Sequence, residues 1–492
     1  MKKISLLGTL LSMLLGITFG QTTLKERTIP VKTYDVRENG LYPSDVVEGP
    51  EEAMAMIQYW PTDNRHNAPN IYLQVHRLED YSLRGQGAAT ELGHEGMEVR
   101  EMRRLERSYA IIGRQYLPKE KRIVSVARFF DLEGKGHASD PVTISTYKGK
   151  PAKDLTEQTL LSPNKKCMLW EGRTTKTNKY YASAWNADGR VLWQASLEVP
   201  HQEKYSIAQT AVADDGGLFF LLTKTKTPTS LKDSLYPPLL VAYNSRSKTF
   251  STDTIQIDSA YSNAAWLAIL PSGEPVVAGV WSRGPSLKGI IQYGSEGDKH
   301  HWGGFFMQRS VLNNSKLERD TSWQDTMPSG WYEQYGIIGP HFGGFNLIVD
   351  KEKGRRVILV AEEISVSGDI IEHGRLGLVG FDPLNCHVVW ESLMDKKQRD
   401  RGTDRFLSYV PMIAKGKLRL VYLSEMGAPG KIVAASFSLR DGKLTQEELA
   451  DNFDSGYLFL PKHSGPVSEN EMILIGLGNP SKSDFKFLKI SF

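Results

Sequence analysis

Residues 163–193 read PNKKCMLWEGRTTKTNKYYASAWNADGRVLW and contain two strand–turn–strand units in succession. The polar turn Pro163-Asn164-Lys165 precedes the apolar run Cys167–Trp170, and the turn Asp188-Gly189 precedes a second apolar run. Asn, Asp and Gly tolerate the positive φ angles that tight turns between antiparallel strands require. Two hairpins in succession predict a sheet of four antiparallel strands.

The same arrangement recurs along the chain. Six further turns precede an apolar strand, at residues 118–121, 214–217, 271–274, 351–354, 415–417 and 468–470. Second turns follow at residues 244–245, 296–297, 382–383 and 441–442. Most intervals between first turns, counted from residue 164, are about 50 to 65 residues, and the outlier runs from residue 272 to residue 352. Four-stranded units at such spacing are typical of propeller blades.

The sequence therefore predicts an all-β fold, a β-propeller of about seven four-stranded blades. The alternative is eight blades, if residues 50–90 form a blade of their own. An N-terminal strand near Ile71–Val75 is expected to pair with the last unit. Helical periodicity is scarce, and the best helix candidate is Met97 to Tyr109, with a charged surface loop as the alternative.

Two units resemble the repeat of quinoprotein-type (PQQ-like) propellers. They are residues 185–193, which end in Trp193, and residues 380–390, which end in Trp390. The resemblance implies that each Trp packs between adjacent blades. A quinoprotein enzyme of this kind would also have adjacent cysteines and a calcium-binding set of acids and amides. Cys167 and Cys386 are far apart, so no cofactor is expected, and unpaired thiols are favoured over a long-range disulfide.

Residues 1–20 have the pattern of an export signal, with Lys2 and Lys3 before the apolar run from Ile4 to Phe19. Removal of this segment leaves residues 21–492, predicted as a single propeller domain with a formal charge of 58 − 57 = +1. A near-neutral surface disfavours a nucleic-acid partner. No later stretch is apolar enough to span a bilayer. The mature chain is expected to be periplasmic, outer-membrane-associated or secreted.

Residues 300–345 are interpreted as an inserted loop region, because they stretch one interval and hold nine aromatic residues. Long insertions in compact folds often carry function. The candidate ligand-binding residues are Trp302, Phe305, Trp323, Trp331, Tyr332, Tyr335 and His341. The main alternative is that these rings are core. A third is catalysis by His300 and His301 with Glu333 or Asp325.

No motif selects a catalytic residue, and the cluster Asp131, Glu133, His137 and Asp140 fits no spacing typical of a metal site, so no metal is expected. The sequence favours an exported, non-catalytic β-propeller of the bacterial cell envelope. It would bind an envelope protein or a glycan through loop-face residues, as a monomer or as part of a larger complex. The alternative is a propeller-fold glycan hydrolase or lyase that uses carboxylates or histidines for acid–base catalysis.

Overall fold

In the computed structural model, nearly all described residues lie in strands or in the turns between them. The one helical element among them is the 3-10 turn η2 (Pro461–His463). None of the described residues forms a helix long and apolar enough to cross a membrane. The structure describes residues 23–29, 47–48, 53–60, 70–79, 82–88, 97–135, 142–148, 155–174, 179–224, 237–258, 261–282, 302–326, 342–350, 354–401, 407–424, 430–451, 457–478 and 485–492.

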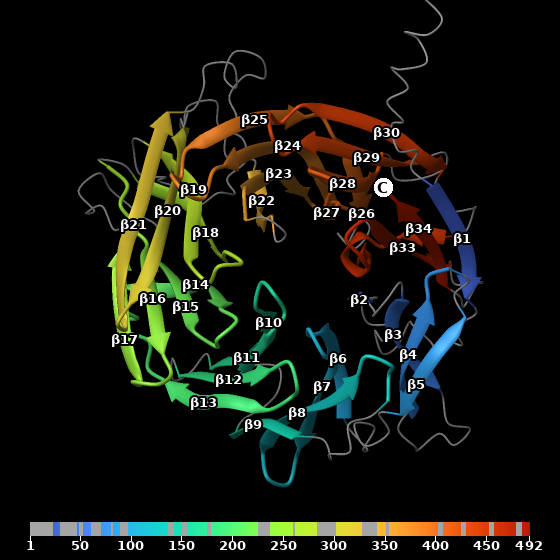
Figure 1. The fold of residues 1–492 in the computed structure, drawn as a ribbon, viewed down its shortest axis with the longest axis horizontal. Coiled ribbons are helices and arrows are strands. Elements are labelled where there is room, and N and C mark those ends of the chain that lie inside the picture. Colours follow the sequence, from blue (N-terminus) through green and yellow to red (C-terminus); the bar gives the residue numbers. More distant parts are fainter. Residues whose placement is uncertain are drawn as a thin grey trace, which may run out of the picture.

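The strands form eight antiparallel sheets, each with a path of four strands, arranged around a ring (Figure 1). Seven sheets contain four consecutive strands, whose chain order is also their order in the sheet. They are β2 (Val47–Glu48), β3 (Ala53–Trp60), β4 (Asn70–Arg77) and β5 (Leu83–Ala88); β6 (Met97–Arg104), β7 (Ser108–Leu117), β8 (Arg122–Asp131) and β9 (Val142–Lys148); β10 (Leu155–Leu161), β11 (Cys167–Thr174), β12 (Tyr180–Asn186) and β13 (Val191–Leu197); β14 (Tyr205–Val212), β15 (Leu218–Lys224), β16 (Leu239–Asn244) and β17 (Thr249–Thr254); β18 (Tyr261–Ile269), β19 (Pro275–Ser282), β20 (Trp302–Asn313) and β21 (Lys316–Thr326); β22 (Phe342–Val349), β23 (Val357–Ser367), β24 (Ile370–Phe381) and β25 (Val388–Met394), with β26 (Gln398–Arg401) on β24; and β27 (Val410–Ala414), β28 (Lys417–Leu423), β29 (Lys431–Ser438) and β30 (Leu444–Asp451).

The eighth sheet joins the two ends of the chain. Its order is β1 (Thr23–Ile29), β34 (Phe485–Ser491), β33 (Glu471–Gly478) and β31 (Tyr457–Phe459), and β32 (Gly465–Pro466) pairs with β33. The register of the closing pair runs from Thr23 opposite Ser491 to Ile29 opposite Phe485. The N-terminal strand therefore forms the outer edge of the last sheet. The expectation for Ile71–Val75 is wrong, because these residues lie in β4, which already pairs with β3 and β5.

The all-β, four-stranded organisation expected from the sequence is confirmed. The prediction of about seven blades did not include the sheet β2–β5. This sheet covers part of residues 50–90, where the alternative of eight blades placed an additional blade. Most predicted turns also occupy the expected places. Residues 163–165 join the first two strands of their sheet, and Asp188-Gly189 joins the last two. Residues 118–121 instead join β7 to β8, the second and third strands.

The expected helix over residues 97–109 is wrong, because residues 97–104 form β6 and β7 begins at Ser108. The interpretation of residues 300–345 as a loop is also wrong for much of its length. Within it, residues 302–313 and 316–326 are the paired strands β20 and β21, joined by a turn at Asn314 and Ser315. The predicted turn at residues 296–297 lies outside the described residues.

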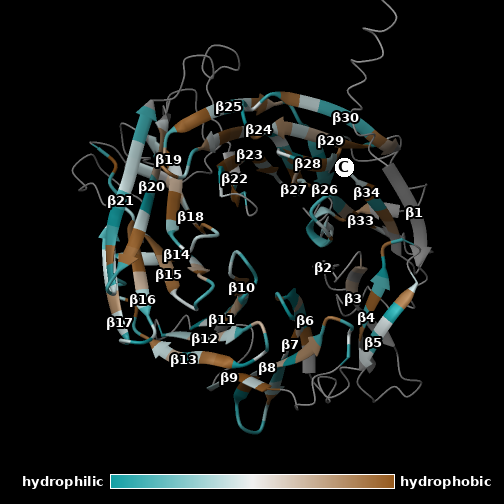
Figure 2. Ribbon diagram, in the orientation of Figure 1, coloured by the Kyte–Doolittle hydropathy of each residue, from teal (hydrophilic) through white to brown (hydrophobic). Residues whose placement is uncertain are grey.

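The apolar core lies between neighbouring sheets. One cluster joins Leu169 and Tyr180 of β11 and β12 to Phe220 of β15, and the Tyr180 and Phe220 ring centroids are 4.9 Å apart. Central strands are the most apolar, as Figure 2 shows along β19, whereas the outer strand β21 is largely hydrophilic. Burial between sheets holds the ring together, since apolar burial is the main favourable term in folding.

The two tryptophans from the propeller-like motifs contact the next sheet, as the resemblance implies. Trp193 Nε1 donates to the Gly216 carbonyl over 2.9 Å, and Trp390 Nε1 donates to the Leu439 carbonyl over 3.0 Å. Each indole therefore adds a directional hydrogen bond to its apolar contact. Cys167 and Cys386 are both buried free thiols, as expected. Burial raises the pKa of the Cys386 thiol to about 11.

Candidate functional site

Of the seven binding candidates proposed from the sequence, the structure describes the side chains of Phe305 and Trp323. The Phe305 side chain is 3% exposed and belongs to the core between two sheets, so this ring is removed from the binding candidates. Trp323 is half-buried in β21, with its ring centroid 5.4 Å from that of His387. Trp302 lies at the start of β20. The remaining candidates, Trp331, Tyr332, Tyr335 and His341, lie outside the described residues, as do His300, His301 and Glu333.

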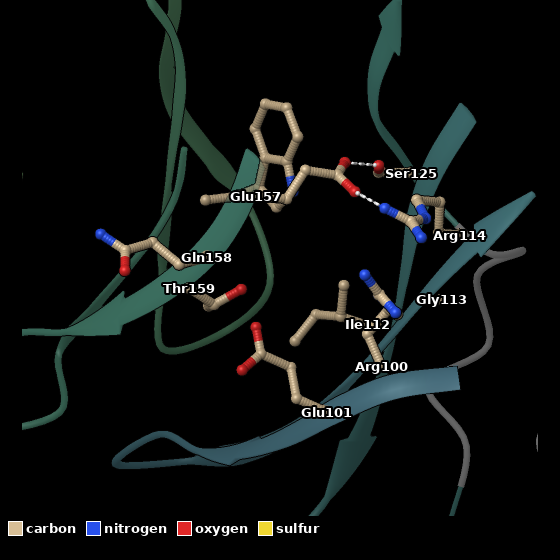
Figure 3. Close-up of a pocket in the computed structure, with 10 residues that line it drawn as sticks. Arg100, Glu101, Ile112, Gly113, Arg114, Ser125, Glu157, Gln158 and Thr159 are labelled. Carbon is tan, nitrogen blue, oxygen red and sulfur yellow. Dashed lines mark hydrogen bonds and ion pairs between the residues drawn. The ribbon is translucent and has the colours of Figure 1, made fainter. Parts of the chain in front are cut away.

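A cavity of about 230 Å³ lies elsewhere, between the sheets β6–β9 and β10–β13. Its lining comes from β6, β7, β8, β10 and β11, so it is placed at the inner strands of two neighbouring sheets. Figure 3 shows the Arg100 guanidinium, the Glu101 carboxylate and the Thr159 side chain around one space, and the Gln158 amide pointing away from it.

Two adjacent residues of β6 line this cavity because the strand contains a β-bulge. Val99 pairs with Gly113 and Glu101 with Ile112, which leaves Arg100 as the extra residue. Successive side chains of a regular strand point to opposite faces, and a bulge breaks this alternation. Inner strands β14, β18 and β22 have comparable register shifts. The bulge is thus a recurrent feature of the fold, and β6 places charged residues at it.

Glu157 of β10 is bound by side chains from the neighbouring sheet. Its carboxylate accepts hydrogen bonds from Arg114 Nη1, at 3.1 Å, and from the Ser125 hydroxyl (Figure 3). The Arg114 and Glu157 side chains are only 14% and 8% exposed. A charge-assisted pair at this degree of burial holds both side chains in place. Glu157 therefore fixes the geometry of the cavity wall.

A second link between the two sheets starts at Arg103 of β6. Its Nη2 atom lies 2.5 Å from Glu101 Oε2 and donates to the Thr159 carbonyl over 3.3 Å. Glu101 is thereby oriented by a neighbour that does not line the cavity. Since an ionised carboxylate has about four acceptor positions, Glu101 keeps the capacity to accept a hydrogen bond from a ligand.

Thr159 has a buried hydroxyl without a partner. Its side chain is 4% exposed, it lines the cavity, and its Oγ1 atom has no hydrogen-bond partner among the described residues. A buried polar group left unsatisfied costs about 1–3 kcal/mol, and such groups are rare in folded proteins. The hydroxyl therefore keeps the capacity to form a hydrogen bond with a group that enters the cavity.

Behind the cavity, polar contacts continue to the third sheet. Gln158 Nε2 donates to Thr210 Oγ1 over 3.3 Å, and Arg173 Nη2 lies 3.0 Å from Glu171 Oε1. Glu171 also accepts a hydrogen bond from the Tyr180 hydroxyl. Burial and the neighbouring Glu171 charge raise the Tyr180 pKa well above its usual value. This network supports β10 from the side opposite to the cavity.

A separate polar cluster lies in the sheet β22–β25 and is almost fully buried. Lys396 Nζ donates to Glu362 Oε1 and to Gln398 Oε1, each over 2.6 Å, and the Ser408 hydroxyl donates to Glu362 Oε2 over 2.7 Å. His373 Nδ1 lies 3.1 Å from Glu362 Oε1. The Lys396 side chain is 0% exposed, so this cluster has a structural role in holding β26 on β24.

One carboxyl group has a pKa suited to proton transfer. Burial, and then the negative charge of Asp325, raise the pKa of Glu391 to about 7. Glu391 is in β25 and Asp325 is in β21 of the preceding sheet. In the described part of the chain, no group of three or more His, Cys, Asp or Glu side chains is placed to hold a metal ion.

The sequence did not single out the cavity residues. They come from five strands spread over residues 100–170, and the short groups that line the cavity, such as residues 100–101 and 157–159, are separated by more than 50 positions in the sequence. The one sequence signal is the concentration of charge in residues 98–107, which lies within the helix candidate Met97 to Tyr109.

Comparisons with known proteins identify no family. No family model matches the sequence, and no curated protein matches it. The fold is similar to that of Sqt1 from Chaetomium thermophilum, with 12% identity, 96% of this chain and 100% of that chain covered, and a TM-score of 0.41. It is also similar to the β-propeller domain of the Trilobed protease from Pyrococcus furiosus, with 9% identity, coverage of 80% and 93%, and a TM-score of 0.37. All these scores are below 0.5, so the propeller assignment depends on the sheet order and the ring.

Proposed function

We propose that this chain is an exported, non-catalytic β-propeller of the bacterial cell envelope that binds a protein or glycan partner. The observation that carries the proposal is the buried Thr159 hydroxyl, which faces a polar cavity and has no hydrogen-bond partner among the described residues. The cavity walls are fixed by the ion pair of Arg114 with Glu157 and by the hydrogen bond from Arg103 to the Thr159 carbonyl, both between two sheets, so the site is formed before a ligand arrives. Preorganised sites lose less free energy to ordering when they bind.

The size of the cavity limits the group that enters it. A volume of about 230 Å³ is below the range of roughly 300–1,000 Å³ typical of sites for drug-sized ligands. It is equivalent to roughly seven or eight water molecules at ~30 Å³ each. A single sugar unit or one side chain of a protein partner is the matching size. The rest of a glycan or protein would contact the surface around the cavity.

The test uses the full chain as bait in an affinity pull-down from envelope extract, beside a glycan array. Thr159→Val keeps the side-chain shape and removes the hydroxyl, so it should reduce capture of the specific partner about tenfold, since one hydrogen bond is worth about 1 kcal/mol or more. Arg107→Ala is the matched surface control, because the Arg107 side chain is 68% exposed and does not line the cavity. Equal capture by the Thr159→Val variant and the wild type would contradict the proposal.

Glycan hydrolysis or lysis is the second candidate, and Glu391 is the observation that favours it. A carboxyl group with a pKa of about 7 is half-protonated at neutral pH and suits a general acid, and Asp325 supplies a second carboxylate nearby. The corresponding assay measures release of reducing ends from array-positive glycans. Activity that disappears in Glu391→Gln would support this candidate over the binding function. No release from any glycan bound by the protein would discard it.

A further inference from the structure

We infer that three turns of two neighbouring sheets form a basic surface, the turn surface, that docks an acidic segment of a protein partner. The turns are residues 350–356 of the sheet β22–β25 and residues 415–417 and 439–443 of the sheet β27–β30, and the two sheets are neighbours in the ring (Figure 1). The cavity lies between other sheets, so the inference goes beyond the proposed function and does not depend on it.

Hydrogen bonds bring the three turns together. Arg356 Nε donates to the Leu439 carbonyl over 2.9 Å, and the Leu439 N–H donates to the Gly416 carbonyl over 3.0 Å. The Leu439 carbonyl also accepts the hydrogen bond from Trp390 Nε1. The middle turn is therefore attached to the other two, and the three turns lie at one place on the ring.

The three turns concentrate positive charge. Their sequence holds eight Lys and Arg residues against three acids, Asp350, Glu352 and Asp441, which gives 8 − 3 = +5. Residues 21–492 as a whole sum to +1, so the rest of the chain sums to 1 − 5 = −4. A positive field is thus placed at two of the eight sheets of a chain that is otherwise net acidic.

The cations of the turn surface are left without carboxylate partners among the described residues. Six of them lie in the described part of the turns, the exposed Arg355, Lys415, Arg440 and Lys443 and the half-buried Arg356 and Lys417, and none forms an ion pair there. Basic residues at other turns do pair, since Arg107 Nη1 lies 3.6 Å from Asp188 Oδ1 and Lys316 Nζ lies 2.9 Å from Glu318 Oε1. Like charges held together repel, so an acidic partner would relieve an unfavourable interaction.

The composition of the turn surface favours an acidic polypeptide over other anionic partners. The three turns contain no aromatic residue on which a sugar ring could pack. An anionic bilayer would extend beyond these two sheets and meet the rest of the ring, which is net acidic. An extended acidic peptide places a carboxylate at about every 3.3 Å, so several can reach the three turns at once. The guanidinium groups of Arg355 and Arg440 can each bind a carboxylate with two hydrogen bonds.

The test measures fluorescence anisotropy of a labelled octaglutamate peptide as the full chain is added. Octaglutamine is the neutral control of the same length, and octagalacturonate is a competitor with the same number of carboxylates on a sugar chain. Co-sedimentation with phosphatidylglycerol vesicles tests the lipid alternative. We expect octaglutamate to bind more tightly than octagalacturonate, octaglutamine and the vesicles not to bind, and the affinity for octaglutamate to fall as salt is raised, because salt screens exposed charges.

Two double variants with the same change in net charge place the binding on the turn surface. Arg355→Glu with Arg440→Glu should weaken octaglutamate binding about tenfold or more, since two attractive pairs become repulsive. Arg190→Glu with Arg246→Glu is the matched control, because both residues are exposed in turns of the sheets β10–β13 and β14–β17, and it should change the affinity by less than about twofold.

Four results would overturn the inference. An equal loss in both double variants would show an effect of net charge alone. Octagalacturonate binding as tightly as octaglutamate would favour an acidic glycan, and binding to the vesicles without binding to octaglutamate would favour a lipid surface. The fourth is that no probe binds. None of these results bears on the proposed function, which is tested by Thr159→Val in the pull-down.

Discussion

Thr159 is the residue on which the binding account depends, and its substitution separates function from stability. Because its hydroxyl has no partner among the described residues, Thr159→Val should leave the free energy of unfolding unchanged or raise it by up to about 1–3 kcal/mol. Thr210 is the matched control, because it is 9% exposed and its hydroxyl accepts a hydrogen bond from Gln158. Thr210→Val should therefore destabilise the protein. Urea denaturation of both variants measures this, and destabilisation by Thr159→Val equal to that by Thr210→Val would show that the Thr159 hydroxyl is satisfied.

Gly442 tests how Trp390 packs between sheets. Gly442 and Gly416 have similar positive φ angles, 69° and 71°, so replacement by Ala strains both backbones alike. A Cβ atom on Gly442 would lie 2.7 Å from Trp390 Cε3, whereas one on Gly416 would meet no atom within 4 Å. Gly442→Ala should therefore cost about 1–3 kcal/mol more than Gly416→Ala. Equal melting temperatures for the two variants would contradict the tight contact of Trp390 with the next sheet.

Glu391 gives the protein a pH dependence of defined sign. Its pKa is raised from 4.5 to about 7 in the folded state, so the folded state binds more protons than the unfolded state between these values. The free energy of unfolding should fall as pH rises through this window. Glu391→Gln removes the ionisable group and should be stabilising at pH 8 relative to wild type, with little difference near pH 4.5. Melting temperatures from pH 4.5 to 8 measure this, with the exposed Glu106→Gln as control. A difference that does not grow with pH would contradict the raised pKa.

At the scale of elements, the hairpins were predictable and the first strand of the cavity was not. Most sheets show two hairpins in the sequence as polar turns between short apolar runs. These hairpins were predictable because a tight turn depends on the few residues that form it. In β6 the bulge at Arg100 shifts the apolar alternation, so that Val99, Met102 and Leu105 are spaced three residues apart. A spacing of three residues is close to the period of a helix, so it suggested a helix. In the structure Val99 and Met102 lie in β6, Leu105 follows it directly, and all three side chains are buried. The cavity could not be predicted for a related reason, since its residues meet only through pairing of distant strands.

The short strand β26 provides a prediction about buried charge. Lys396→Met would leave Glu362 buried without its cation, and breaking a buried pair costs about 3–5 kcal/mol. The neighbouring Lys397 is exposed, so Lys397→Met is the control and should be nearly neutral. The double variant Lys396→Met with Glu362→Gln should recover part of the loss. Denaturation midpoints of the three variants provide the comparison, and a neutral Lys396→Met would show that the ion pair contributes nothing to β26.

At the scale of the whole molecule, the ring is closed by pairing of the chain ends. β1 completes the sheet that contains β34, so the last sheet depends on residues more than 450 positions apart in the sequence. Seven sheets form from consecutive strands, which explains why their repeat is visible in the sequence. The sequence predicted that a strand near Ile71–Val75 would close the ring. The true closing strand, β1, was missed because it lies next to the predicted export signal and has no turn motif to mark it. A closed ring gives the cavity fixed walls, as a site formed in advance requires.

The proposed function requires that the protein bind its partner without changing it chemically. The most direct measurement incubates the full chain with the glycan or protein captured from envelope extract, recovers the partner and determines its mass by mass spectrometry. We expect a partner of unchanged mass, bound to the wild type at one copy per chain and largely lost by Thr159→Val. A partner recovered as shorter fragments would contradict it and would identify the protein as an enzyme.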